Sequence, residues 1–430
     1  MKNYPLMLVT LAISTLLAGC QDETTTKAPD TQATSVKQVS LSAPQLGDFS
    51  VTEVTEPQLP PINSSRESLS FISVPTKTFT ISPPSDSHSS TSDEYWTTVT
   101  GAELNRGISL AISQASSIIR ISPRADLSSG FLMHSQAISP HKIQLINLDE
   151  KSGASKSSAN IHSLVDPQAL ATAGLTDDSS ALTMPSNAKP GKYQLKVSEP
   201  LGAKSSYLVN VKEKHSPYQL KLTSKFRVSS QSRSLDFNIS LTNSDQQLRP
   251  TASLKHSDGS YLALKLVSDN GQWQAQLPES LTRPSSNLGL SEIQINMQTR
   301  VNGIQVIRTV KTAFKQFVPS AKIQQQVNTR WLEGVPVSID FTLDIAEEGR
   351  FSLSGYLTGS DASGQDRTIL KTESANWLTL DNSSIQLKLD PKLVKQSGLS
   401  APFKLMGLEL KDQGQMARLS YQQEALILEQ

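Results

Sequence analysis

The sequence predicts an all-β protein, with two to three β-sandwich domains in tandem after a disordered tether and one short helix in the first domain. Three observations favour this fold class. Short segments of alternating apolar and polar side chains recur from about residue 95 to the C-terminus, as in strands that bury one face. Turn residues separate many of these segments. Only one segment carries both the start and the stop signals of a helix.

The first 19 residues have the layout of a secretory signal peptide. Lys2 supplies a positive charge, and the apolar run Leu6–Leu17 follows it. This run is too short to span a bilayer as a helix. It ends in Leu17-Ala18-Gly19-Cys20, which resembles the lipobox of bacterial lipoproteins. The resemblance implies cleavage between Gly19 and Cys20, with lipid on Cys20 as the new first residue.

Cys20 is the only cysteine among 430 residues, so its lipidation would leave no thiol for disulfides, catalysis or metal binding. The alternative is an ordinary signal peptide whose cysteine is incidental. Acyl chains such as palmitate contribute about 0.8 kcal/mol per buried CH₂, so several chains anchor a protein durably at a membrane. Gln21 stands where lipoproteins retained in the inner membrane commonly carry aspartate. We therefore expect an outer-membrane anchor, with the domains facing the periplasm or the cell surface.

Residues 20–93 are predicted to form a flexible tether. Thr, Ser, Pro, Gln and Asp dominate this segment, whose only aromatic residues are Phe49, Phe71 and Phe79. So little apolar surface cannot offset the entropy of ordering. A coil of about 70 residues spans roughly 45–50 Å on average, which would hold the folded part clear of the membrane. Within it, Ser68–Val74 and Lys77–Ile81 alternate enough to be strands that pair with the first domain.

The first folded domain is placed at residues 94–214. Its expected strands are 107–110, 117–121, 142–148, 191–197 and 206–211. The last two alternate most clearly, so we expect them in one half-buried antiparallel sheet. The helix signal has Asp166 as N-cap, Pro167 at the first helical position and Gly174 as the stop. Such a short helix would cover one end of the sheet.

Two further domains are placed at 215–318 and 319–430, because Pro217 and Pro319 each end one alternating run before another begins. Turn signals such as Asn302-Gly303 and Glu348-Gly349 join the strands. The expected strands are 235–241, 251–255, 261–267, 272–277, 291–299 and 305–314, then 335–343, 351–357, 376–380, 384–389, 404–410 and 417–421. This number and spacing of strands is typical of one β-sandwich in each block.

Two passages resemble known modules. The first comprises residues 269–275 followed by Arg308, Phe314, Phe317 and Pro319. It is similar to immunoglobulin-like modules of secreted bacterial proteins, in which an Asp-Gly turn leads into an aromatic strand. The second, 397–412, resembles the closing strand pair of a module that often follows. Together with 103–107 and 119–123, they make the chain similar to an uncharacterised family of bacterial secreted proteins and lipoproteins. The resemblance implies tandem immunoglobulin-like sandwiches over residues 95–430 and no catalytic residues.

No pattern typical of a metal or catalytic site stands out. The six histidines, at positions 88, 134, 141, 162, 215 and 256, include no pair at i, i+4 spacing, so we expect no metal. Ser139-Pro140-His141-Lys142 matches the S-x-x-K spacing of penicillin-interacting enzymes, which requires a helix. The lysine instead begins a strand-like run, and no K-T-G follows. We therefore expect a chance match.

Other chemically suggestive residues are also better explained by structure. The carboxylate pairs Asp177-Asp178 and Glu347-Glu348 are adjacent in sequence, and neighbouring strand residues point to opposite faces. We expect them to be solvated loop charges. The four tryptophans do not line one strand at alternate positions as a carbohydrate-binding face would need. We expect them to be core plugs or end caps of the sandwiches. They are Trp96, Trp273, Trp331 and Trp377.

Charge excludes one class of partner. Forty basic and 39 acidic side chains give a net charge of +1 without a long block of like charge, so we expect no nucleic acid partner. The sequence favours a lipid-anchored, non-enzymatic envelope or surface protein without cofactors, which binds a protein or cell-surface ligand in adhesion or envelope assembly. No ligand-binding residue can be assigned. Two alternatives stay open: a periplasmic accessory or inhibitor subunit of a partner enzyme, and a hydrolase using Ser139 or His141 in the first domain.

Overall fold

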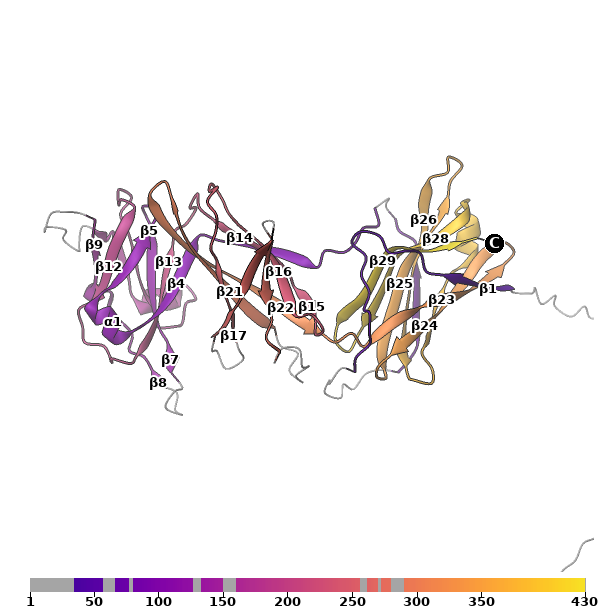
Figure 1. The fold of residues 1–430 in the computed structure, drawn as a ribbon, viewed down its shortest axis with the longest axis horizontal. Helices are drawn as coiled ribbons and strands as arrows, with labels where there is room; N and C mark the ends of the chain where they lie inside the picture. Colours follow the sequence, from indigo (N-terminus) through magenta and orange to yellow (C-terminus); the bar gives the residue numbers. More distant parts are fainter. Residues whose placement is uncertain are drawn as a thin grey trace, which may run out of the picture.

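Three β-sandwiches lie in a row (Figure 1). The computed structural model describes residues 35–56, 66–76, 80–126, 133–149, 160–255, 261–269, 272–279 and 290–429. Each sandwich has its own hydrophobic core, the first between Tyr95 and Val211, the second between Leu220 and Phe314, and the third between Ala321 and Leu428. The all-β fold class, with sandwiches in tandem, is confirmed.

The first sandwich packs two sheets around its core. Its strands are β4 (Glu94–Thr100), β5 (Ile108–Ile112), β6 (Ile118–Pro123), β7 (Ala125–Asp126), β8 (Met133–His134), β9 (Ile143–Asn147), β10 (Ser163–Val165), β11 (Ser180–Thr183), β12 (Gly191–Val197) and β13 (Ser206–Lys212). One sheet has the order β10-β11-β6-β13-β4 and the other β5-β12-β9, while β7 and β8 form a hairpin. The alternation expected in β12 and β13 is present, but their placement in one sheet is wrong. They belong to opposite sheets and bury their apolar faces towards each other.

The predicted helix is present as α2 (Pro167–Thr172), capped by Asp166, whose carboxylate accepts a hydrogen bond from the Ala169 amide at 2.8 Å. The expectation of a single helix is nevertheless wrong, because the first sandwich also contains α1 (Gly101–Arg106) and the 3₁₀ turn η1 (Pro140–Lys142). The third sandwich adds α3 (Pro391–Gln396). All of these helices span less than two full turns, so their caps rather than their length define them.

The second sandwich consists of two five-stranded sheets. Its strands are β3 (Ser87–Ser92), β14 (Leu220–Lys225), β15 (Arg227–Ser229), β16 (Ser234–Leu241), β17 (Thr251–Lys255), β18 (Tyr261–Leu264), β19 (Leu266–Asp269), β20 (Gln272–Gln276), β21 (Ser291–Val301) and β22 (Ile304–Phe317). The sheet orders are β19-β20-β16-β14-β3 and β15-β22-β21-β17-β18. Asn302 and Gly303 join β21 to β22 with positive φ angles of 51° and 81°, as a type I′ hairpin turn requires. The sequence also carries turn signals at 257–259 and 269–271; residues 257–259 and 270–271 lie outside the described residues.

The third sandwich has a four-stranded and a five-stranded sheet. Its strands are β1 (Ser35–Ser40), β2 (Leu69–Ser73), β23 (Ala321–Leu332), β24 (Val335–Ile345), β25 (Gly349–Ser360), β26 (Asp366–Leu378), β27 (Ser384–Lys388), β28 (Ser400–Asp412) and β29 (Ala417–Leu428). The sheet orders are β1-β23-β24-β27 and β2-β26-β25-β28-β29. Both sheets therefore contain a strand from the N-terminal part of the chain.

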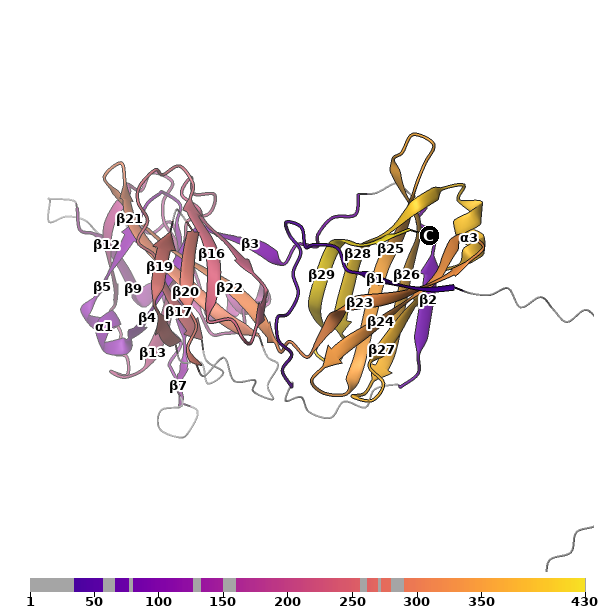
Figure 2. The ribbon, with the colours of Figure 1, turned by 45° about the vertical axis from the view of Figure 1, so that its right-hand side comes forward.

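We call the described parts of residues 35–92 the strap, because this segment adds a strand to each of the last two sandwiches before entering the first. In the third sandwich β1 pairs with β23 and β2 with β26, and in the second β3 pairs with β14. The chain then continues into β4 of the first. Figures 1 and 2 show these dark strands running back along the molecule, from the third sandwich to the first.

The prediction of a flexible tether over residues 20–93 is wrong for the strap. Its polar side chains contribute little to a core, but its main chain forms ladder hydrogen bonds at sheet edges, which satisfy both the strap and the edges. The strand expected at 68–74 is confirmed as β2, although it pairs with the third sandwich and not the first. Residues 20–34, 57–65 and 77–79 lie outside the described residues, and with them most of the strand expected at 77–81.

Candidate functional site

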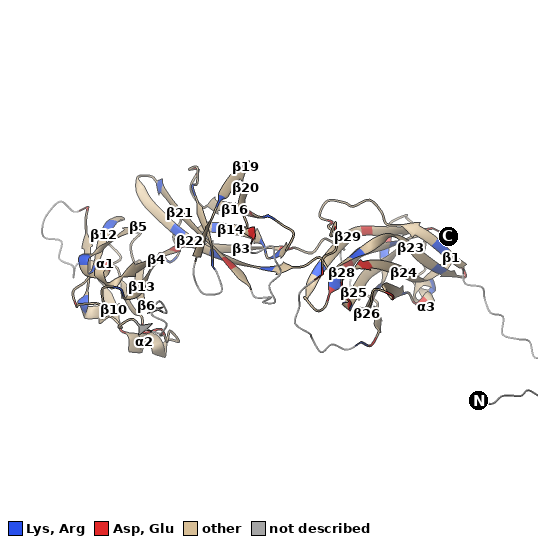
Figure 3. Ribbon diagram, turned by 60° about the horizontal axis from the view of Figure 1, so that its bottom comes forward, with Lys and Arg blue, Asp and Glu red and all other residues tan. Residues whose placement is uncertain are grey.

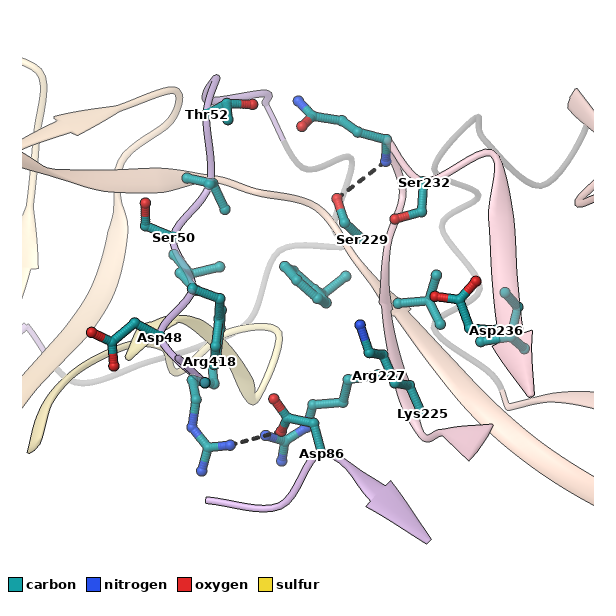
Figure 4. A pocket seen from close by; sticks show the side chains of 18 of the residues that line it. Asp48, Ser50, Thr52, Asp86, Lys225, Arg227, Ser229, Ser232, Asp236 and Arg418 are labelled. Atoms are coloured by element: carbon teal, nitrogen blue, oxygen red, sulfur yellow. Dashed lines mark hydrogen bonds and ion pairs between the residues drawn. The ribbon is translucent and has the colours of Figure 1, made fainter. Parts of the chain in front are cut away.

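A cleft of about 820 Å³ lies where the strap crosses between the second and third sandwiches. This volume falls within the range of small-molecule sites. Three walls enclose it: strap residues 47–52 and 83–86, residues 225–236 of the second sandwich, and Arg418 with Leu419 of the third. Figure 4 shows Asp48, Ser50 and Arg418 on one side and the residues from β14 to β16 on the other.

The strap wall is fixed to the third sandwich through β29. The main chains of Phe49 and Tyr421 exchange two hydrogen bonds, of 3.0 and 2.9 Å. The carboxylate of Asp48 accepts hydrogen bonds from the backbone amides of Gln45 and Gln423, both at 2.7 Å. Gly47 has a φ of +94°, and a Cβ added there would lie 3.0 Å from the Pro83 ring. Glycine therefore lets the two passes of the strap approach closely beside the cleft.

The chain passes from the second to the third sandwich beside the cleft, through a buried polar network centred on Gln415. The Gln415 side chain accepts from the Val318 amide at 2.7 Å and donates to the Val318 carbonyl at 2.9 Å and to Asp412 Oδ2 at 2.7 Å. Ser320 Oγ donates to the same carboxylate at 2.5 Å. Because every polar atom of the Gln415 amide is used, this network fixes the start of the third sandwich relative to the end of the second.

The acidic groups near the cleft all have partners within the protein. Arg418 forms ion pairs with Asp86, at 2.8 Å, and with Glu409. Burial alone would raise the pKa of Glu409, but hydrogen bonds from Lys411 and Arg418 hold it below its ordinary value. On the opposite wall, the Asp236 carboxylate accepts from Gln274 Nε2 at 3.0 Å.

Two cations of the cleft, unlike these acids, have no partner side chain among the described residues. Within the described residues, Lys225 and Arg227 form no ion pair or hydrogen bond with another side chain. The Arg227 guanidinium carbon lies 5.3 Å from the centre of the Phe226 ring, a contact that leaves its N–H groups available. Both signs of charge are spread over all three sandwiches (Figure 3), so charge alone does not mark the cleft. What the cleft adds is that two cations without an acidic partner line one cavity.

The junction of the first and second sandwiches is closed and contains a buried ion pair. Arg308 and Glu213 have side chains 0% exposed, and Arg308 Nη2 lies 2.7 Å from Glu213 Oε2. The guanidinium also donates to the Tyr218 carbonyl at 2.7 Å and to Ser216 Oγ at 2.8 Å. The Ser113 amide donates to the other Glu213 oxygen at 2.6 Å. Since no solvent reaches this pair, it joins the sandwiches and offers no ligand site.

The predicted S-x-x-K match does not form a catalytic arrangement. Ser139 precedes the one-turn 3₁₀ helix η1, and its amide donates to Glu199 Oε1 at 3.0 Å. His141 and Lys142 are exposed, and no hydrogen bond joins them to the Ser139 hydroxyl in the described structure. The chain does contain the S-D-N tripeptide of penicillin-interacting enzymes, at 268–270. Ser268 lies in β19 of the second sandwich, so it belongs to a different body from Ser139.

The acidic and tryptophan residues singled out from the sequence do not line the cleft. Asp177 is an exposed loop residue, as expected, and its carboxylate lies 3.4 Å from Arg120 Nη2. Trp331 is 4% exposed and packs in the core against Phe403, as expected of a core plug. Trp96 instead donates from Nε1 to Gln294 across the first junction at 3.0 Å.

Neither the expected lipidation site nor a metal site can be placed among the described residues. Gly19 and Cys20 lie outside them. Over the described ranges, no cluster of three or more His, Cys, Asp or Glu is arranged to hold a metal ion. In the same ranges no helix combines the length and the apolar character needed to cross a bilayer.

Sequence reasoning did not identify the cleft residues. They come from positions 47–52, 83–86, 225–236, 317 and 418–419, so no local spacing links them. In the sequence, the segments that form the cleft show only the polar composition of the strap and the alternation of β14. Neither pattern predicts that residues 48 and 418 lie close together, because their proximity depends on the pairing of the strap with β29.

Several solved structures match this chain. A DUF4785 family protein from Legionella pneumophila matches with a TM-score of 0.63 and 20% identity, over 88% of this chain and 98% of that one. The FN1–FN3 domains of chicken CNTN1 match with a TM-score of 0.21 and 8% identity, over 75% of this chain and 98% of that one. A tetra-tandem repeat of a large adhesion protein matches with a TM-score of 0.17 and 12% identity, over 78% of this chain and 74% of that one.

Sequence comparison identifies the first and last parts of the chain. No curated protein matches it significantly. Residues 60–213 match the N-terminal domain, and residues 320–429 the C-terminal domain, of a family described as a domain of unknown function, DUF4785. The first match includes the strap from residue 60 onward, and the second covers nearly all of the third sandwich. The chain therefore carries the N-terminal and C-terminal domains of the DUF4785 family.

Proposed function

We propose that this protein is a lipid-anchored, non-enzymatic binding protein of the bacterial outer membrane, and that the cleft is its binding site. The observation that carries the proposal is the strap. By adding strands to the third and second sandwiches before entering the first, it ties the three bodies into one arm. The junctions at Arg308 and Gln415 strengthen this arrangement, because each contains a buried and fully hydrogen-bonded polar network. A cleft between fixed walls suits binding, since little ordering entropy is lost when a ligand enters.

The strap also determines which end of the arm would face the membrane. Ser35 opens β1 on the third sandwich and stands 15 positions after Cys20. Fifteen residues reach at most roughly 50–54 Å. Lipid on Cys20 would therefore keep the third sandwich close to the bilayer and present the first sandwich, at the opposite end of the row in Figure 1, outward. The C-terminal sandwich, not the N-terminal one, is the membrane-proximal body in this proposal.

Two measurements test the anchor and its orientation. Cys20→Ala should move the protein from the outer-membrane fraction to the soluble fraction, because the lipid is lost. With Cys20 consumed by lipid, an introduced cysteine is the only free thiol and can be labelled alone. Lys189→Cys in the first sandwich and Leu380→Cys in the third provide exposed positions.

The labelled proteins are reconstituted in liposomes that contain a lipid-linked acceptor dye. We expect strong energy transfer from position 380 and weak transfer from position 189. Equal transfer, or the reverse order, would contradict the orientation, and an unchanged membrane fraction for Cys20→Ala would contradict the anchor.

A further inference from the structure

We propose that the cleft between the second and third sandwiches binds an anionic ligand, through carboxylate or phosphate groups held by Lys225 and Arg227. The inference rests on the proposed role of the cleft as a binding site and adds the class of ligand. It follows from the balance of charges in the cleft, from the hydroxyl groups that line it and from the placement of the two cations.

The charges that line the cleft leave two cations unpaired. Asp48 accepts from two backbone amides, Asp236 accepts from the Gln274 side-chain amide, and Asp86 pairs with Arg418. Arg418 is itself occupied by two acids, Asp86 and Glu409. Lys225 and Arg227 have no such partner among the described residues. A carboxylate or phosphate entering the cleft would thus gain charge-assisted hydrogen bonds without breaking an existing ion pair.

The two cations come from neighbouring points of one wall. Lys225 ends β14 and Arg227 begins β15. Figure 4 shows both side chains extending into the opening, with the ammonium group of Lys225 facing the strap. Arg227 offers a planar fork that can bind one anionic group through two hydrogen bonds, whereas Lys225 supplies a point charge. Two cations in one cleft favour a ligand with more than one acidic oxygen.

Hydroxyl groups surround these cations on two walls. Ser50 and Thr52 belong to the strap, while Ser229 and Ser232 belong to the second sandwich. A hydroxyl both donates and accepts, so these groups can bind the oxygens of an anion and the hydroxyls of a sugar to which the anion is attached. The buried side chain of Leu419 also lines the cleft. The chemistry of the walls therefore matches a hydroxylated anion, such as an acidic sugar.

Calorimetric titration of the purified full-length protein tests the inference with three probes. Digalacturonate carries carboxylates, glucose 1-phosphate carries a phosphate, and maltose is a neutral disaccharide. We expect one or both anions to bind and maltose to bind at least tenfold more weakly. The stronger of the two anions identifies the acidic group. Affinity should fall as salt is raised, because salt screens exposed charges.

Variants assign the binding to the cleft. Lys225→Gln and Arg227→Gln should each weaken anion binding about tenfold, the loss expected for one charged hydrogen bond. Lys221→Gln is the matched control, because Lys221 is an exposed lysine on β14, on the same face as Lys225 but outside the cleft. It should bind like the unaltered protein, and all three variants should retain their melting temperature.

Three results would overturn the proposal: no binding of either anion, equal binding of maltose, or equal effects of Lys221→Gln and Lys225→Gln. These failures are separate from a failure of the anchor, because the titration does not depend on lipid and the liposome measurement does not depend on a ligand.

Discussion

Replacing Arg308 by methionine tests whether the buried ion pair holds the first two sandwiches together. Methionine keeps much of the volume of the arginine side chain but has none of its hydrogen-bond donors. Arg308 is fully buried, and its guanidinium contacts Glu213, Ser216 and the Tyr218 carbonyl within 2.8 Å. The variant would leave the Glu213 carboxylate buried without a cation, while its hydrogen bonds with Ser113 remain.

The unpaired carboxylate determines how much stability the variant should lose. Removing one partner of a buried ion pair typically lowers the free energy of unfolding by about 3–5 kcal/mol, because the remaining charge is desolvated without compensation. Glu213→Gln should cost a similar amount, since it leaves the guanidinium without a counter-charge. The double variant, Arg308→Met with Glu213→Gln, contains no unpaired charge. We therefore expect it to lose about 1–3 kcal/mol less than the sum of the two single variants.

Urea unfolding followed by hydrogen exchange measures these losses sandwich by sandwich, which a single midpoint cannot do for a protein of several domains. Protection of β13 and β22 should fall, since these strands flank the pair. The third sandwich, whose core is separate, serves as an internal control. A loss below about 1 kcal/mol for Arg308→Met, or full additivity in the double variant, would refute the reasoning.

Three further predictions concern the strap and the second junction. Gln415→Ala should destabilise the third sandwich in urea by about 1–3 kcal/mol, because it leaves buried polar groups without partners; a loss below 0.5 kcal/mol would count against this. The pKa of Glu409 is below its ordinary value of 4.5, so its contribution to stability is present above pH 4.5 and lost as the pH falls through the lowered value. Glu409→Gln should therefore flatten the acid side of the thermal stability profile, and an unchanged slope would contradict this role. Gly407→Ala places a Cβ 2.9 Å from a strap side chain, whereas Gly364, also at positive φ, has open space; only the first variant should speed hydrogen exchange at residues 80–86.

The cores could be predicted from sequence because alternation reports burial directly. Tyr207, Val209 and Val211 are all 0% exposed, as their spacing predicts. Alternation fixes which face of a strand is buried but not which strand lies beside it, so β12 and β13 were assigned to one sheet instead of two. The helix α1 had a recognisable signal, since Thr100 and Glu103 form a capping box. α2 is equally short but could be predicted because a proline follows its N-cap, and α1 has no such proline.

The strap could not be predicted because its pairing depends on the backbone. β3 has the sequence SHSSTS, without an apolar side chain, yet its main chain pairs with β14 from Ser87 to Ser92. Backbone groups are the same in every residue, so composition contains no record of such pairing. The cleft could not be predicted for the same reason, because its walls meet only after residues far apart in sequence have paired.

The strap has a consequence for the order in which the molecule folds. Ser35 pairs with Trp331, roughly 300 residues further along, which at 5–20 residues per second is synthesised about 15–60 s later. The first sandwich closes with strands from one continuous stretch, but β1 and β2 must wait until nearly the whole chain has emerged. Such distant contacts slow folding. During this wait Phe71 and its neighbours in β2 are free to pair with other chains, so we expect the protein to need a holding chaperone until its last strands arrive.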